Sequence, residues 1–383
     1  MLRWDKLLEL ARGEWGEDSI ENSRLKRKYD KGEANHNEYI ELARLCLENK
    51  NPRKCEEVLT TLLALEGVSE RIVEDACGIL EQIGSYERAF EGYSRIASMN
   101  PSSPVPVYKM GRIYEMMGRL TEAIDMHKKA IEIAPDNPEC YYRLGVAYTK
   151  NHQYDEAEEQ YRKAISIDPT HYKSYTNLGY ILDLRGKRNA ALQQFRKAVQ
   201  YNPKSAEVHF NLGALYGEEG QNEQAIREFR IGLELDPTSI EGHYNLGVAL
   251  VNMQNYIEAE EEFQKILKLE HDNVNALFYL GYIYYRRGLY SKSLKFLKQA
   301  SRLNPGNATI LYYIGECYNK LEQPEEAVEY YKRVTEINPS DSKVYFSLGI
   351  IYEKQDDKSK AREYYRMAAM KSGEQLDKSS RAS

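Results

Sequence analysis

The sequence of 383 residues predicts an all-α fold, a solenoid of tandem antiparallel helix pairs, and two observations lead to it. The first is an internal repeat, since HFNLGA at 209–214 and HYNLGV at 243–248 are nearly the same six residues, 34 positions apart. The second is a helical spacing of apolar residues within each repeat. Stacked repeats bury their apolar faces on one another, so a chain of this length need not contain several globular domains.

Glycine sets the register of the repeat, and a small residue and a proline follow it at fixed distances. Stepping by 34 residues from Gly213 meets a glycine in eight successive repeats without an insertion. Proline stands 24 positions after most of these glycines, with His271 as an exception. The glycines are Gly111, Gly145, Gly179, Gly213, Gly247, Gly281, Gly315 and Gly349.

Each repeat is expected to form two helices, as residues 138–171 illustrate. Tyr141, Leu144 and Tyr148 follow the i, i+3, i+7 spacing of a first helix, and Ala157 and Tyr161 mark the apolar face of a second. The proline that follows lacks an N–H group to donate and therefore ends the second helix.

Glycine also stands between the two helices of many repeats, where a left-handed residue is needed to end the first helix. These glycines are Gly84, Gly118, Gly186, Gly220 and Gly288. Within a pair, Gly145 and Ala157 have little or no side chain. We therefore expect the two helix axes to approach more closely than the usual ~8–10 Å.

This pattern resembles the tetratricopeptide repeat (TPR), a 34-residue helix–turn–helix unit with alternating small and large residues. Residues 138–171, PECYYRLGVAYTKNHQYDEAEEQYRKAISIDPTH, are close to that family's consensus throughout. The resemblance implies a right-handed superhelix whose first helices line a concave groove.

The register divides the chain into four segments. Residues 1–35 are expected to form a helical N-terminal cap, with helices at 4–13 and 19–30, and 36–103 form two degenerate TPR units. Residues 104–371 form eight TPR units with the 34-residue period. The polar residues 372–383 are expected to be a disordered C-terminal tail.

Composition narrows the choice of compartment and partner. The net charge of −6 disfavours binding to nucleic acid, and no stretch reaches the ~20 apolar residues of a membrane span. The N-terminus mixes charges into every turn, unlike a signal peptide. Five scattered cysteines without a CxxC pair indicate free thiols in a reducing compartment. We expect a cytoplasmic protein.

The sequence offers no catalytic machinery. None of the seven histidines has the spacing of a metal site, and His209 and His243, at the fourth position of successive repeats, are interpreted as packed core residues. No glycine-rich phosphate-binding or nucleophile motif occurs in a suitable context, because the glycines serve helix packing. We predict no enzyme activity, no cofactor and no metal.

Binding residues are expected at the second, sixth, ninth and thirteenth positions of each first helix, which we call the first-helix face. Asn177, Asn211 and Asn245 hold its sixth position in three successive repeats, where an amide that donates and accepts can hold the peptide groups of an extended chain. Asparagine there is also ordinary TPR consensus, so a purely structural role remains open. Aromatic residues at the fifth position are expected to pack between repeats. The candidate peptide-binding residues are Arg143, Asn177, Tyr180, Asn211, Asn245, Asn252, Tyr282, Tyr285 and Arg286.

The leading hypothesis is a scaffold or adaptor that binds an extended segment of a partner protein in its concave groove. The alternative is the substrate-recognition subunit of a multi-component enzyme, such as a sugar transferase or kinase system, because similar asparagine ladders occur in the repeat arms of protein O-linked sugar transferases. RNA binding by helical repeats is disfavoured by the acidic balance. The last repeat lacks the polar closing helix that usually caps such arrays, so we expect end-to-end self-association to cover apolar residues left partly exposed there, namely Tyr364, Tyr365, Met367 and Met370.

Overall fold

The computed structural model describes the backbone of residues 20–381 and the side chains of residues 24–372. Over this range the chain forms 21 helices and no strand, which confirms the all-α fold. The expected helix at 4–13 lies outside the described residues. None of the helices described is both long enough and apolar enough to cross a membrane.

The chain divides into two compact parts, Met1–Tyr201 and Asn202–Ser383, and each is described by itself. The helices of the first part are α2 (Ile20–Asp30), α3 (His36–Glu48), α4 (Pro52–Ala64), α5 (Glu70–Gln82), α6 (Tyr86–Met99), α7 (Val105–Met116), α8 (Leu120–Ile133), α9 (Pro138–Lys150), α10 (Tyr154–Ile167), α11 (Tyr172–Leu184) and α12 (Arg188–Tyr201). The helices of the second part are α13 (Ala206–Glu218), α14 (Asn222–Leu235), α15 (Ile240–Asn252), α16 (Tyr256–Leu269), α17 (Val274–Arg286), α18 (Tyr290–Leu303), α19 (Ala308–Lys320), α20 (Pro324–Ile337), α21 (Ser342–Lys354) and α22 (Lys358–Arg381).

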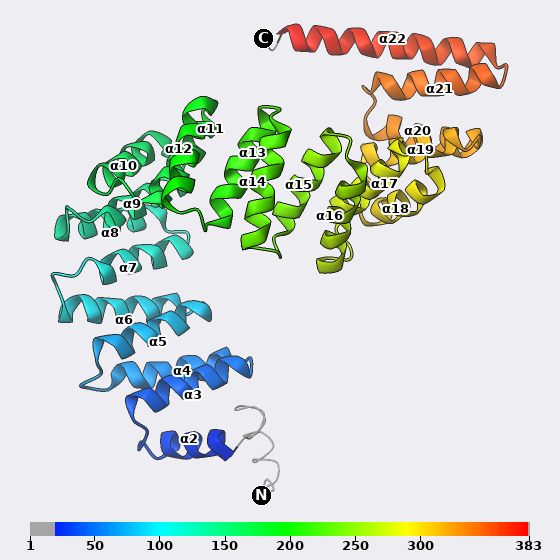
Figure 1. The fold of residues 1–383 in the computed structure, drawn as a ribbon. Helices are drawn as coiled ribbons and strands as arrows, with labels where there is room; N and C mark the ends of the chain where they lie inside the picture. Colours follow the sequence, from blue (N-terminus) through cyan, green and yellow to red (C-terminus); the bar gives the residue numbers. More distant parts are fainter. Residues whose placement is uncertain (1–19, 382–383) are drawn as a thin grey trace, which may run out of the picture. The chain divides into compact units, whose positions relative to one another are not determined.

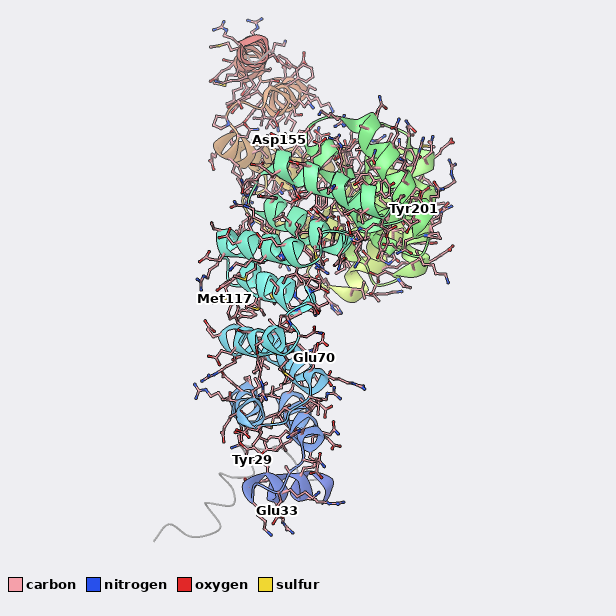
Figure 2. The ribbon with its side chains drawn as sticks, turned by 90° about the vertical axis from the view of Figure 1, so that its left-hand side faces the viewer. Tyr29, Glu33, Glu70, Met117, Asp155 and Tyr201 are labelled. Carbon is pink, nitrogen blue, oxygen red and sulfur yellow. The ribbon has the colours of Figure 1, made fainter. Side chains whose placement is uncertain are left out.

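Helix pairs stack in chain order within each part. In the first part, each helix from α3 to α12 packs on its neighbour in the chain, and first helices such as α7 and α9 also meet (Figure 1). Figure 2 shows this order along the stack, from Tyr29 on α2 past Glu70 at the start of α5 and Met117 after α7 to Asp155 on α10. The second part repeats the arrangement, with α13 against α15 and α17 against α19. This is the predicted tandem array of helix pairs.

The turn inside each pair confirms the expected left-handed residue. Gly84, Gly118, Gly186, Gly220 and Gly288 all have a positive φ, between 69° and 77°. Repeats without glycine adopt the same turn at a residue with a side chain. These residues are Lys50, His152, Gln254, Glu322 and Asp356, with φ between 56° and 59°. A side chain in this conformation costs roughly 1 kcal/mol relative to glycine, so the repeat geometry outweighs the local preference.

The register glycines accommodate a ring of the second helix, except Gly281, which meets Leu297; this corrects the expectation that Gly145 pairs with a small residue. A Cβ atom at Gly145 would lie 2.6 Å from Cε1 of Tyr161, and one at Gly213 would lie 2.7 Å from Cε1 of Phe229. The ring stands 16 positions after the glycine, on the second helix. Ala157 is fully buried on the same second helix, but the side chain closest to Gly145 is the ring of Tyr161. A side chain on the first helix would displace that ring.

Aromatic residues at the fifth position pack between successive repeats, as expected. A Cβ atom at Gly232 on α14 would lie 2.4 Å from Cε1 of Phe210, and one at Gly242 on α15 would lie 2.7 Å from the same atom. The Phe210 ring is therefore held between the second helix of its own repeat and the first helix of the next. In the first part, the centre of the Tyr142 ring lies 6.0 Å from Nζ of Lys173, on the first helix of the next repeat.

Of the two predictions for the ends of the chain, the helix at 19–30 is confirmed and the disordered tail at 372–383 is wrong. The expected helix at 19–30 is present as α2, and its Leu25 is buried. The expected disordered tail at 372–383 is replaced by helix as far as Arg381, because α22 continues for 24 residues. Each of the second helices from α6 to α20 ends just before an Asn-Pro, Ala-Pro, Asp-Pro or Glu-His pair. The equivalent pair in α22 is Ser372-Gly373. The sequence has no proline there to interrupt the backbone hydrogen bonds.

Candidate functional site

Three candidate residues, Arg143, Asn177 and Tyr180, lie on the first-helix face of the N-terminal part. The Arg143 Nε donates to Glu139 at 2.6 Å, and its guanidinium lies 5.4 Å from the centre of the Tyr142 ring. The Asn177 amide donates to the hydroxyl of Tyr161 at 3.2 Å. The side chain of Tyr180 is 50% exposed. Arg143 and Asn177 are thus already held by neighbours, while Tyr180 is open to a ligand.

The asparagines of the C-terminal part differ from Asn177 in their bonding. Asn211 on α13 and Asn245 on α15 occupy the same position of two first helices that pack on each other, and both are half-buried. Asn177 bonds a tyrosine hydroxyl, but the residues equivalent to Tyr161 in the preceding repeats are Phe195 and Phe229, which have none. In the described part of the chain, neither amide makes a hydrogen bond to protein. Asn252, at the end of α15, is exposed.

Tyr282, Tyr285 and Arg286 form part of an aromatic cluster on α17. Arg286 donates from Nη1 to the hydroxyl of Tyr282 at 2.6 Å, and its guanidinium lies 5.6 Å from the Tyr282 ring centre and 5.7 Å from that of Tyr256. The rings of Tyr282 and Tyr285 both meet Tyr313 of the next first helix edge to face, at 5.2 and 5.4 Å. Aromatic contacts of this geometry fix the position of each ring. The structure therefore brings these three candidates into one ordered surface.

Glu316, which belongs to the first-helix face by its position but is not among the candidate peptide-binding residues, lies at the centre of this cluster. The hydroxyl of Tyr285 donates to Glu316 Oε2 at 3.0 Å, and the hydroxyl of Tyr331 donates to Oε1 at 2.5 Å. Ser347, on the next first helix, donates to the same Oε1 at 3.4 Å. Glu316 stands at the ninth position of α19, on the first-helix face. Its position in the repeat places it on the candidate face. Its hydrogen bonds could not be predicted from the sequence, because the three donors come from three other helices.

The tyrosines around Glu316 remain hydrogen-bond donors at any physiological pH. Burial, together with the neighbouring Glu316 carboxylate, raises the pKa of the Tyr285 and Tyr331 hydroxyls far above the ordinary value. Burial and the same carboxylate raise the pKa of Tyr312 to about 12. A phenol that keeps its proton can only donate to a carboxylate. The cluster thus presents a fixed acid surrounded by aromatic rings.

His209 and His243 are core residues, as predicted, and each joins two elements. Nδ1 of His209 lies 2.7 Å from Glu228 and Nε2 lies 3.0 Å from the carbonyl oxygen of Pro203. His243 repeats this with Glu262 at 2.6 Å and the carbonyl of Pro237 at 3.0 Å. Both ring nitrogens of each histidine are therefore occupied by protein groups. Among the described residues, no cluster of three or more metal-ligating side chains exists.

The five cysteines are free and buried, so they offer no exposed nucleophile. Burial raises the pKa of Cys46, Cys140 and Cys317 to about 11 and that of Cys55 and Cys77 to about 12. The thiolate is the reactive form of cysteine, and these groups remain thiols at neutral pH.

Comparison with protein families matches three models to this chain. The model described as "Cilia and flagella-associated protein 70 C-terminal domain" matches residues 171–383, more than half of the chain. A tetratricopeptide-repeat model matches residues 138–171, the segment that resembles the TPR consensus throughout, and a further TPR repeat model matches residues 111–152. A comparison with curated proteins gave no match.

Solved structures of repeat proteins resemble parts of the chain. A tetratricopeptide repeat protein from Parabacteroides merdae is 24% identical, with a TM-score of 0.49, over 61% of this chain and 92% of that protein. The protein MamA is 25% identical, with a TM-score of 0.42, over 45% and 94%. YrrB, described as a TPR protein with an unusual peptide-binding site, is 24% identical, with a TM-score of 0.40, over 48% and 95%.

Proposed function

The chain belongs to the TPR family described as cilia and flagella-associated protein 70 C-terminal domain, and from this premise we propose that it is a non-enzymatic scaffold that binds an extended segment of a partner protein. The first-helix face would form the concave binding surface that stacked helical repeats provide. The proposal assigns binding to the chain and leaves any chemistry to its partners. A cytoplasmic location belongs to the same proposal.

The observation that supports this proposal most strongly is the pair Asn211 and Asn245. Two half-buried amides without a protein partner occupy the same position of adjacent first helices. An amide can donate to a peptide carbonyl and accept from a peptide N–H at once, so it reads the backbone of an extended chain rather than its side chains. First helices lie about 10 Å apart, and an extended chain rises about 3.3 Å per residue. Successive amides would therefore contact ligand residues that are roughly three positions apart.

The aromatic cluster supports a second contact farther along the same part of the chain. Arg286 is exposed but positioned by Tyr282 and Tyr256, and Glu316 is positioned by three hydroxyl donors. Ordered arginine and tyrosine side chains are frequent centres of binding energy at protein interfaces, since little entropy is lost when they bind. A ligand that combines a backbone in extended form with charged side chains would use both regions.

The description of the matched family guides the choice of partner. Because that family is described as cilia and flagella-associated, we propose structural proteins of cilia and flagella as the partner class to test first.

The test is a selection of peptides against the full chain, followed by affinity measurements. A displayed library of segments from cilia and flagella proteins is selected for binding, and the best peptide is measured by fluorescence anisotropy. Asn211→Ala with Asn245→Ala is expected to weaken binding about 30- to 700-fold, because each lost amide removes one or two hydrogen bonds worth about 1 kcal/mol each.

The matched control changes two amides on second helices. Gln264→Ala with Gln299→Ala removes two exposed amides from α16 and α18 and is expected to leave the affinity unchanged. Equal losses in the two double variants, or no loss in the asparagine variant, would contradict the proposed use of the first-helix face.

A further inference from the structure

The last repeat of the described chain contains an open pocket at its end. This pocket has a volume of about 820 Å³ and is lined mainly by α21 and α22, with Tyr312 of α19 also at its wall. Phe346 and Lys343 of α21 line one side, and Tyr365, Ala368 and Ala369 of α22 line the other. Phe346 is 53% exposed, an unusual state for a large aromatic side chain.

Two repeats earlier, a helix covers the residues at the same repeat positions. Phe278 corresponds to Phe346 and Ala300 to Ala368, and both belong to a hydrophobic cluster completed by the first helix that follows, α19. That helix contributes Ile310 and Ile314, which are at most 1% exposed. The surface formed by Phe278 of α17 and Ala300 of α18 therefore binds the first helix of the next repeat, and we call such a surface a helix seat.

The Phe210 repeat shows the same seat in closer detail. The Phe210 ring lies between Gly232 on its own second helix and Gly242 on the incoming first helix, close enough to exclude a Cβ atom at either. In the last repeat, Phe346 and Ala368 supply the ring and the small residue. Ala368 is buried, at 7% exposure, but Phe346 is 53% exposed, and in the described part of the chain no first helix follows α22.

The seat stays open because α22 does not turn back. Where α18 stops before the sequence Asn304-Pro305 and the chain returns as α19, α22 continues through Ser372 to Arg381. The described part of the interface that joins successive helices in the C-terminal part thus ends at the surface of Phe346 and Ala369.

We propose that this end surface, formed by Phe346, Ala368 and Ala369, binds an amphipathic α-helix of a partner protein. The helix would lie where the next first helix would lie, and its apolar residues would follow the i, i+4, i+7 spacing of Ile310, Ile314 and Cys317. We infer a helix as the occupant because Phe346 and Ala368 hold the same repeat positions as Phe278 and Ala300, which α19 covers. The pocket shares Lys343 and Ser347 with the first-helix face, but the proposal rests on Phe346 and Ala369 and does not depend on the function proposed for that face.

The experiment uses the full chain and a helical probe taken from the chain itself. The probe is a fluorescein-labelled peptide with the sequence of α19, residues 308–320, joined by a lactam between the side chains of Glu316 and Lys320. The lactam is needed because a free peptide of this length would be largely unfolded. Binding is measured by fluorescence anisotropy, with a scrambled peptide as control.

Two arginine variants of α22 distinguish the seat from its surroundings. Ala369→Arg fills the seat from an exposed position and is expected to weaken probe binding about tenfold or more. Met370→Arg, at the neighbouring residue, which is 60% exposed and lines a different pocket, is expected to leave the affinity unchanged. Equal circular dichroism spectra would establish that both variants fold.

Three results would overturn the proposal. These are failure of the probe to bind, binding that Ala369→Arg leaves unchanged, and binding that Met370→Arg weakens equally. Sedimentation of the full chain without the probe gives an independent check. A dimer that Ala369→Arg dissociates would assign the seat to a second copy, the end-to-end association considered from the sequence, and would exclude a separate partner helix as its occupant.

Discussion

Substitution of Gly213 by alanine tests the packing of a ring on the register glycine, which joins the two helices of most repeats. A Cβ atom at Gly213 would lie 2.7 Å from Cε1, 2.8 Å from Cδ1 and 3.2 Å from Cζ of Phe229. The Phe229 side chain is only 2% exposed, so the ring has little room to move away. Such overpacking typically costs about 1–3 kcal/mol.

Gly217→Ala, one turn later on the same helix, provides the matched control. Its Cβ atom would meet only the Cβ of Ala225, at 3.9 Å, which is ordinary contact. Alanine is favoured over glycine inside a helix by about 1 kcal/mol, and both variants gain this contribution. Gly217→Ala should therefore stabilise the protein, whereas the clash should leave Gly213→Ala neutral or destabilised by up to about 2 kcal/mol.

The assay is urea unfolding followed by circular dichroism, together with amide exchange of α13 and α14. A double-mutant cycle with Phe229→Ala isolates the clash, because removing the ring should make Gly213→Ala behave like Gly217→Ala. Gly213→Ala that stabilises the protein as much as Gly217→Ala does in the presence of Phe229 would refute the packing argument.

Three further predictions follow from the turns, the buried ion pairs and the thiols. His152→Gly should stabilise the protein by about 1 kcal/mol in urea unfolding, since His152 has a φ of 57°, and no gain would argue against strain there. Burial opposes ionisation of Glu262, but hydrogen bonds from His243 and Lys265 outweigh it and lower its pKa. Its folded-state pKa is thus below the ordinary glutamate value of 4.5, so its contribution is present above that pH and lost as the pH falls through the folded-state pKa. Unfolding midpoints of the wild type and Glu262→Gln should therefore differ at neutral pH and converge in acid, and a constant difference would exclude this linkage. Cys77, whose pKa burial raises to about 12, should react with iodoacetamide only in the unfolded protein, as mass spectrometry can show; rapid labelling of the folded chain would contradict its burial.

The 34-residue register allowed most of the fold to be predicted from sequence alone. It located the helix pairs, and the TPR model matches the same bounds, 138–171, that the sequence indicated. It also located the left-handed turn at Gly186, whereas the equivalent turn at His152 was not predicted because no glycine marks it. Repeated geometry makes such positions predictable because each repeat must bury the same face on its neighbour.

Features that depend on side chains from several helices could not be predicted in this way. The partner of Gly145 is Tyr161 rather than a small residue, because the glycine leaves room for a ring from the second helix. The hydrogen bonds of Glu316 come from three other helices, so no spacing along the sequence marks them. Asn177, Asn211 and Asn245 look alike in sequence, yet only Asn177 meets a tyrosine hydroxyl.

The central proposal is that a partner lies along the first helices, and site-specific photo-crosslinking tests it most directly. A benzophenone amino acid replaces Ala214, a half-buried residue of the first-helix face on α13, or Arg227, an exposed residue on the second helix α14. We predict that the selected peptide crosslinks to the protein at position 214 and not at position 227. Crosslinking at position 227 alone, or equally at both positions, would contradict the account.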